Sequence, residues 1–160
     1  MAEIKNIDLE GFITEAVTNV FDMMLSMETQ VFVPGKPLEL EGNRIVAAVG
    51  FSGDVVGALS IQLKHDFARL ITAKMLGMES EEIEGLEEIK DVIGELGNMI
   101  GGSVKSRFCD HNLPCVLSIP SITYGINFKV STLKGARQER FYYRHQQDIS
   151  LVDLYLKNGS

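Results

Sequence analysis

Apolar residues recur every three or four positions in three parts of the chain, which is the spacing of an amphipathic helix. This pattern predicts helices over residues 8–28, 65–76 and 84–110. Asn6 or Asp8 stands where a side chain can cap the first helix, and Gly77 stands where glycine commonly ends the second. The apolar positions of the first helix are Phe12, Ile13, Ala16, Val17, Val20, Phe21 and Met24.

Shorter segments rich in alternating apolar residues predict β-strands. Ser52, Gly53 and Asp54 supply turn residues between two of them, which therefore form a hairpin. The last strands carry many charges, which suits exposed sheet faces or a sheet edge. Helices beside a largely antiparallel sheet predict an α+β fold, with two long helices packed on the sheet. The predicted strands span residues 30–33, 44–51, 55–64, 115–124, 127–133, 137–145 and 149–156.

The composition is that of an ordinary globular protein, with 45% hydrophobic and 23% charged residues. The chain has 160 residues, and we find no low-complexity linker or internal repeat in it, so we expect a single domain over residues 1–160. A formal net charge of −7 disfavours nucleic acid and anionic membranes as partners, because both bind basic surfaces.

Cysteine and histidine positions indicate no metal or redox motif. Cys109 and Cys115 lie six positions apart, which excludes a CxxC motif, and His65, His111 and His145 are scattered. We therefore expect no metal site and no cofactor of the chain's own. The sequence shows no secretory signal and no apolar run of about 18 residues, so we expect a cytoplasmic protein with reduced thiols.

The segment richest in candidate chemistry is the first half of the third predicted helix. At about 100° per residue, Glu95 falls about 40° to one side of Asp91, and Asn98 falls about 20° to the other. The three polar side chains therefore share one stripe, which points outward because the opposite stripe is apolar. On this pattern alone, a merely solvated surface remains the commoner explanation. The apolar residues opposite are Val92, Ile93, Leu96, Met99 and Ile100.

Four glycines surround this stripe, namely Gly94, Gly97, Gly101 and Gly102. Each glycine inside a helix costs roughly 0.5–1 kcal/mol relative to alanine, so their presence calls for a reason. Close packing inside the fold is one, and the glycines alone favour it. Close approach of a partner around Asn98 is the other. A phosphate-binding loop is excluded, because no strand precedes the glycines and no Lys-Ser/Thr pair follows them.

The pattern Asp91-x-x-x-Glu95-x-x-Asn98 resembles the signature of the CheC, CheX and FliY chemotaxis phosphatases. Residues 12–21, 50–57, 73–77 and 93–100 are also similar to segments of CheX proteins, in the same order. The resemblance covers about residues 7–125. In the family pattern a proline follows, and Pro120 stands one position closer to Asn98 than that pattern places it.

The resemblance implies an enzyme that hydrolyses the aspartyl phosphate of a CheY-type response regulator. In this family Asn98 would orient the attacking water and Glu95 would dock onto the lysine of the receiver domain, while Asp91 is assigned a supporting role. An acyl phosphate is already activated, so positioning a water and stabilising charge are sufficient. The resemblance also implies a homodimer, and Mg²⁺ held by the receiver rather than by this chain.

An alternative of the same fold is a signalling or flagellar adaptor that binds a receiver domain without useful turnover. The intact pair of Glu95 and Asn98 favours the enzyme over the adaptor. For the homodimer, we expect the charged C-terminal strands to pair at an edge or to cover one.

Overall fold

A computed structural model describes residues 3–126 and 136–159. Its helices are α1 (Leu9–Leu25), α2 (His65–Leu76) and α3 (Leu86–Asp110), with 3₁₀ turns η1 (Ile4–Asn6) and η2 (Ser80–Glu82). Its strands are β1 (Gln30–Phe32), β2 (Arg44–Gly53), β3 (Val55–Lys64), β4 (Cys115–Leu117), β5 (Ser121–Gly125), β6 (Arg137–His145) and β7 (Asp148–Asn158). The predicted strand over residues 127–133 lies outside the described residues.

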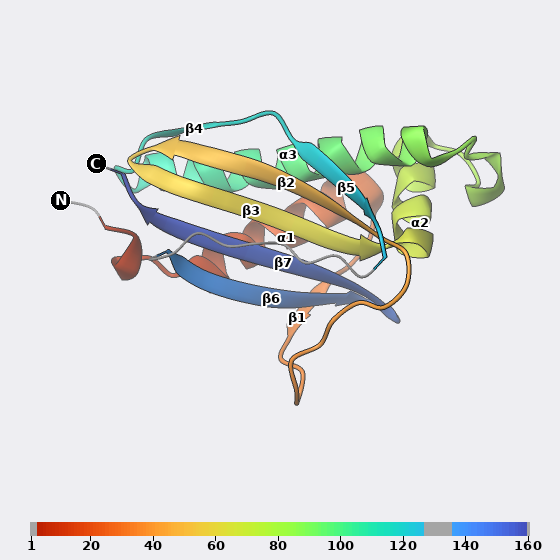
Figure 1. Cartoon of the computed structure of the whole chain (residues 1–160), viewed down its shortest axis with the longest axis horizontal. Helices are drawn as coiled ribbons and strands as arrows, with labels where there is room; N and C mark the ends of the chain where they lie inside the picture. The colour runs from red at the N-terminus through yellow and green to blue at the C-terminus, as the bar shows by residue number, and fades with distance from the viewer. Residues whose placement is uncertain (1–2, 127–135, 160) are drawn as a thin grey trace.

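The strands form one antiparallel sheet in the order β1-β6-β7-β3-β2-β4, and β5 also pairs with β2. The predicted hairpin is present, with Arg44 opposite Lys64 and Phe51 opposite Gly57. In Figure 1, α1 and α3 lie behind the sheet and α2 stands at one end of it. Two long helices on an antiparallel sheet confirm the α+β fold class.

Helix ends follow from local capping chemistry. The Asp8 carboxylate accepts a hydrogen bond of 3.0 Å from the backbone N–H of Gly11 and so caps α1. This helix ends three residues earlier than expected, because Ser26 adopts a left-handed conformation with φ of 52°. Gly77, with φ of 68°, ends α2 where the sequence predicts it.

One hydrophobic core lies between the sheet and the helices. Alternation along β2 turns every second side chain toward α3, and the rings of Phe51 and Phe108 meet edge to face at 5.7 Å. The apolar stripe predicted for the first helix is buried at Ile13, Ala16, Val17 and Phe21. Phe12 and Val20 of the stripe are half-buried, whereas the prediction is wrong for Met24, which is 48% exposed near the end of α1.

The predicted strand over residues 115–124 is divided by a bulge. Phe51 pairs with Leu117 and Ala48 pairs with Ser121, so the two intervening residues of β2 face three residues, 118–120. The extra residue breaks the ladder. Pro120, within the bulge, has no N–H to donate, and proline is tolerated in sheets mainly at edges and bulges.

The charged C-terminal strands are not simply edge strands. β7 lies between β3 and β6, and β1 covers the last part of β6. An edge position is therefore wrong for β7. The charges instead pair across the sheet surface, where Arg140 Nε lies 2.6 Å from Asp153 Oδ1.

Candidate functional site on helix α3

The longest helix of the described residues, α3, divides its circumference into three faces. Acidic residues Glu87 and Glu88 occupy its first turn, where the helix dipole favours negative charge. An apolar face enters the core, a glycine face lies against the sheet, and a polar stripe faces outward. The buried residues of the first two faces include Ile89, Ile93, Gly94, Leu96, Gly97, Ile100, Gly101, Val104 and Phe108.

The glycine face packs directly on the sheet. A methyl group added at Gly97 would lie 3.0 Å from Cβ of Ala47, and one at Gly101 would lie 2.6 Å from Cγ2 of Val49. At Gly94 it would lie 3.2 Å from Cδ1 of Ile122. These separations are shorter than ordinary carbon–carbon contacts of about 3.5–4.0 Å. Internal packing is therefore confirmed as the reason for these three glycines.

Gly102 differs from the other three. Its added methyl group would meet nothing within 4 Å. Packing therefore does not explain this glycine, which lies one turn beyond Asn98 on the outward stripe. The surface next to Asn98 is bare at this point.

The structure brings the predicted site residues together on the outward stripe. Asp91 and Glu95 are exposed, and Asn98 is half-buried. Residues three apart on a helix hold their Cβ atoms about 5–6 Å apart, so Glu95 and Asn98 can reach one bound group. Within the described residues, none of the three side chains makes a hydrogen bond or ion pair. Their polar atoms therefore face outward, where a partner can engage them.

The two central side chains differ in what they can bind. The Glu95 carboxylate only accepts hydrogen bonds and attracts cations, whereas the Asn98 amide both accepts and donates. Asp91, one turn before Glu95, adds a second negative charge to the same side. A partner that meets this surface is thus favoured when it presents a cation to Glu95 and an oxygen-rich group to Asn98.

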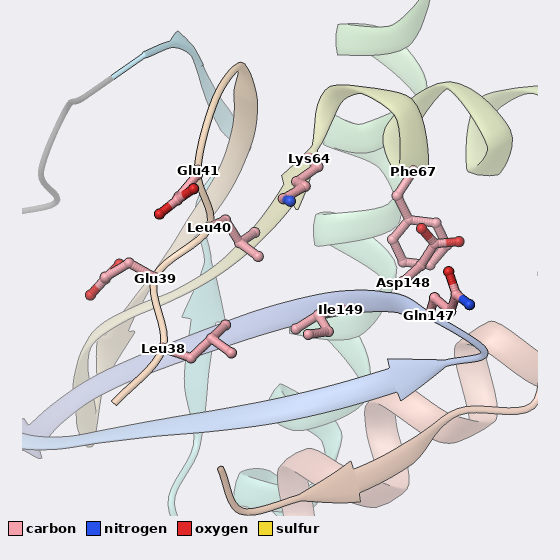
Figure 2. Close-up of a pocket in the computed structure, with 9 residues that line it drawn as sticks. All are labelled: Leu38, Glu39, Leu40, Glu41, Lys64, Phe67, Gln147, Asp148 and Ile149. Atoms are coloured by element: carbon pink, nitrogen blue, oxygen red, sulfur yellow. The ribbon is translucent and has the colours of Figure 1, made fainter. Parts of the chain in front are cut away.

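A pocket is formed by residues outside α3 (Figure 2). Its volume is about 340 Å³, and its walls come from the loop before β2, from the β3–α2 junction and from the β6–β7 turn. The lining residues are Leu38, Glu39, Leu40, Glu41, Lys64, Phe67, Gln147, Asp148 and Ile149. Because α3 contributes no residue to it, this pocket is separate from the polar stripe.

The sheet surface carries a network of charged and polar side chains around Arg140 that the sequence pattern did not predict. Arg140 binds Asp153 through Nε and Nη2 at 2.6 and 3.0 Å, and binds Glu39 at 2.6 Å. The hydrogen bonds to Asp153 raise the pKa of Arg140 above its ordinary value. Gln62 also donates to Asp153 at 3.0 Å. Since these groups satisfy one another, the network serves to hold the loop before β2 on the sheet.

The described residues contain no group of three or more His, Cys, Asp or Glu side chains placed to hold a metal ion. Among the same residues, no helix is both long and apolar enough to cross a membrane.

A family model described as chemotaxis phosphatase CheX matches residues 45–143. The chain belongs to this CheX family. The match runs from β2 into β6 and includes the whole of α3 with its polar stripe. The recognition made from the sequence is therefore confirmed. The comparison with curated proteins found no match.

Solved structures of the CheX and CheC-like group share the fold. The chemotaxis protein CheX from Vibrio vulnificus is 20% identical with a TM-score of 0.80, over 94% of this chain and 97% of that one. A CheC-like superfamily protein from Shewanella sp. PV-4 is 22% identical with a TM-score of 0.81, over 96% and 99%. The match in the CheX–CheY–BeF₃–Mg²⁺ complex from Borrelia burgdorferi is 21% identical with a TM-score of 0.75, and it covers 95% of this chain and 99% of that one. At these identities the likeness shows the fold.

Proposed function

We propose that this chain hydrolyses the aspartyl phosphate of a CheY-type receiver domain, with Asn98 and Glu95 as its site residues. The observation that carries the proposal is the outward pair Glu95 and Asn98, without partners among the described residues, on α3 of a CheX-family chain. The Borrelia burgdorferi structure, a complex of CheX with CheY, BeF₃ and Mg²⁺, supports a receiver of this type as the partner.

Asn98 orients the attacking water. Its carbonyl oxygen accepts a hydrogen bond from the water, and its amide group donates to the water or to a phosphoryl oxygen. The water oxygen attacks phosphorus, the bond from phosphorus to the aspartate oxygen breaks, and inorganic phosphate and a free carboxylate remain. A neutral amide suits this role because it does not repel the phosphoryl oxygens. The half-buried position of Asn98 restricts its rotamers and so helps to hold the geometry.

Glu95 positions the receiver. Its exposed carboxylate pairs with the receiver's active-site lysine through a charge-assisted hydrogen bond. Asp91 supports this contact with a second negative charge one turn away. The receiver itself contributes Mg²⁺, held by its own carboxylates, so this chain supplies no cofactor.

The direct test follows loss of phosphate from a phosphorylated CheY-type receiver of the same organism, with Mg²⁺ present. The wild-type chain should accelerate the loss, and Asn98→Ala should abolish the acceleration while its circular dichroism stays unchanged. Asn19→Ala is the matched control, because Asn19 is an exposed asparagine on α1. Undiminished turnover in Asn98→Ala would refute the assigned role. Binding without any acceleration by the wild-type chain would establish the adaptor alternative instead.

Receiver docking by Glu95 is tested through binding. Glu95→Lys should weaken binding to the phosphorylated receiver, whereas Glu81→Lys, an equal charge change at an exposed position in η2, should not. Equal affinities of Glu95→Lys and the wild-type chain in a titration would remove Glu95 from the docking contact.

A further inference from the structure

The bulge between β4 and β5 runs beside the turns of α3 that carry the site. A methyl group added at Gly101 would lie 3.3 Å from Cδ1 of Leu117, and one added at Gly94 would lie 3.7 Å from Cγ of Pro120. The segment between these two contacts therefore follows α3 from Gly101 back to Gly94. Ile119 lies within this segment, between the residues that contact α3 at Gly101 and at Gly94.

The segment borders the Asn98 side of the polar stripe. Measured around the helix from Asp91, Gly94 and Gly101 fall about 60° and 80° to the same side as Asn98, which falls at about 20°. Glu95 falls about 40° to the other side. Asn98 is thus the site residue nearer to the bulge.

Backbone and side-chain hydrogen bonds hold this bulge in place. The Ser118 N–H donates to the Gly50 carbonyl at 2.9 Å, and the Gly50 N–H donates to the Ser118 hydroxyl oxygen at 2.8 Å. That hydroxyl donates to the Ile119 carbonyl at 3.0 Å, and Pro120 has a fixed φ. Despite this ordered backbone, Ile119 is 88% exposed. An apolar side chain is therefore presented on a backbone that loses little further freedom on binding.

A receiver docked on α3 around Asn98 reaches this segment. A standard protein–protein interface buries about 800 Å² per partner, which corresponds to a circle of about 16 Å radius. Centred on Asn98, such a footprint extends well past the neighbouring bulge. Apolar residues near the centre of an interface contribute more to affinity than residues at its rim.

We infer that Ile119 is a specificity-determining residue of this surface, which binds an apolar side chain that the receiver presents beside its phosphorylated aspartate. The inference rests on the proposed function. Among receivers with the same phosphorylation chemistry, Ile119 selects those whose surface is apolar beside the phosphorylated aspartate. A receiver with a charged side chain there binds less well, because the charge loses its water against Ile119.

The test measures affinity for a receiver activated with beryllofluoride, which takes the place of the phosphoryl group on aspartate, and steady-state hydrolysis of the phosphorylated receiver. Ile119→Ser should raise the dissociation constant and KM about tenfold, with kcat unchanged. Ile119→Leu, which keeps the apolar contact, should stay near the wild-type values. Val33→Ser is the matched control, since Val33 is 89% exposed and directly follows β1, which lies at the opposite end of the strand order from β4.

The possible results separate this inference from the proposed function. If the wild-type chain hydrolyses the receiver, Asn98→Ala does not, and Ile119→Ser binds as tightly as the wild type, only the role of Ile119 is overturned. If the wild-type chain neither binds nor hydrolyses any receiver of the organism, the proposed function fails and this inference fails with it. An equal loss in Val33→Ser also overturns the inference, because the effect would then not be local.

Discussion

Alanine at Gly101 and alanine at Gly102 should change stability in opposite directions, although the two residues are neighbours on α3. Replacing glycine by alanine inside a helix gains up to about 1 kcal/mol from backbone entropy at either position. At Gly102 nothing lies within 4 Å of the new methyl group, so the gain is kept. At Gly101 the methyl group would lie 2.6 Å from Cγ2 of Val49.

The clash at Gly101 cannot be relieved by a simple side-chain rotation. Val49 is buried on β2, and valine has few accessible rotamers. Overpacking of this kind costs typically 1–3 kcal/mol, so Gly101→Ala should be about 1–3 kcal/mol less stable than Gly102→Ala. For a chain of this size that corresponds to a difference in melting temperature of about 2–12 °C.

Urea unfolding followed by circular dichroism measures this difference directly. The comparison is valid if the free energy of unfolding falls with urea concentration at the same slope in both variants. A different slope would indicate an altered unfolded state. The reasoning is refuted if Gly101→Ala is as stable as Gly102→Ala, because the glycine face would then not lie against β2 as closely as the structure shows.

Two further predictions concern buried ionisable groups. Burial raises the pKa of Tyr143 to about 12 from 10.0, so the folded state favours the neutral phenol. Two pKa units correspond to about 3 kcal/mol in the free energy of unfolding, which is present below pH 10 and is lost as the pH rises toward 12. Because phenylalanine does not ionise, Tyr143→Phe should lose less of its free energy of unfolding over this pH range, as measured by urea unfolding at each pH. Cys109 is exposed, whereas Cys115 is buried and burial raises the pKa of its thiol. Because the thiolate is the reactive form, a thiol-specific chromophoric reagent should modify Cys109 rapidly and Cys115 only after unfolding, and two equally fast thiols would contradict this.

Elements governed by neighbouring residues were predictable from the sequence. The bounds of α2 and β3 agree with the prediction, because a glycine cap and a short hairpin turn fix them locally. The outward position of Asp91, Glu95 and Asn98 likewise follows from helical periodicity alone. The chemistry proposed for them rests on the resemblance to a family, since an exposed polar stripe has no distinguishing geometry of its own.

Features that depend on distant pairing were not predictable. The bulge at residues 118–120 exists because of its register against β2, about 70 residues earlier in the chain. The bond between Arg140 and Glu39 joins positions 101 residues apart. Pro120 is a local signal that the strand predicted over residues 115–124 is interrupted, because proline is tolerated in sheets mainly at edges and bulges. The exact place of the bulge, opposite the two residues of β2 between Ala48 and Phe51, depends on pairing with β2 and could not be predicted.

The glycines show how the structure separates packing from function where the sequence could not. Gly94, Gly97 and Gly101 are accounted for by contacts with the sheet, but Gly102 has no contact that alanine would disturb. If Gly102 served the fold alone, alanine there would be stabilising without cost. Under the proposed function the bare surface admits the receiver close to Asn98, so Gly102→Ala should raise stability yet weaken receiver binding. A variant that gains stability and keeps full affinity would show that the docked receiver stays clear of this turn of α3.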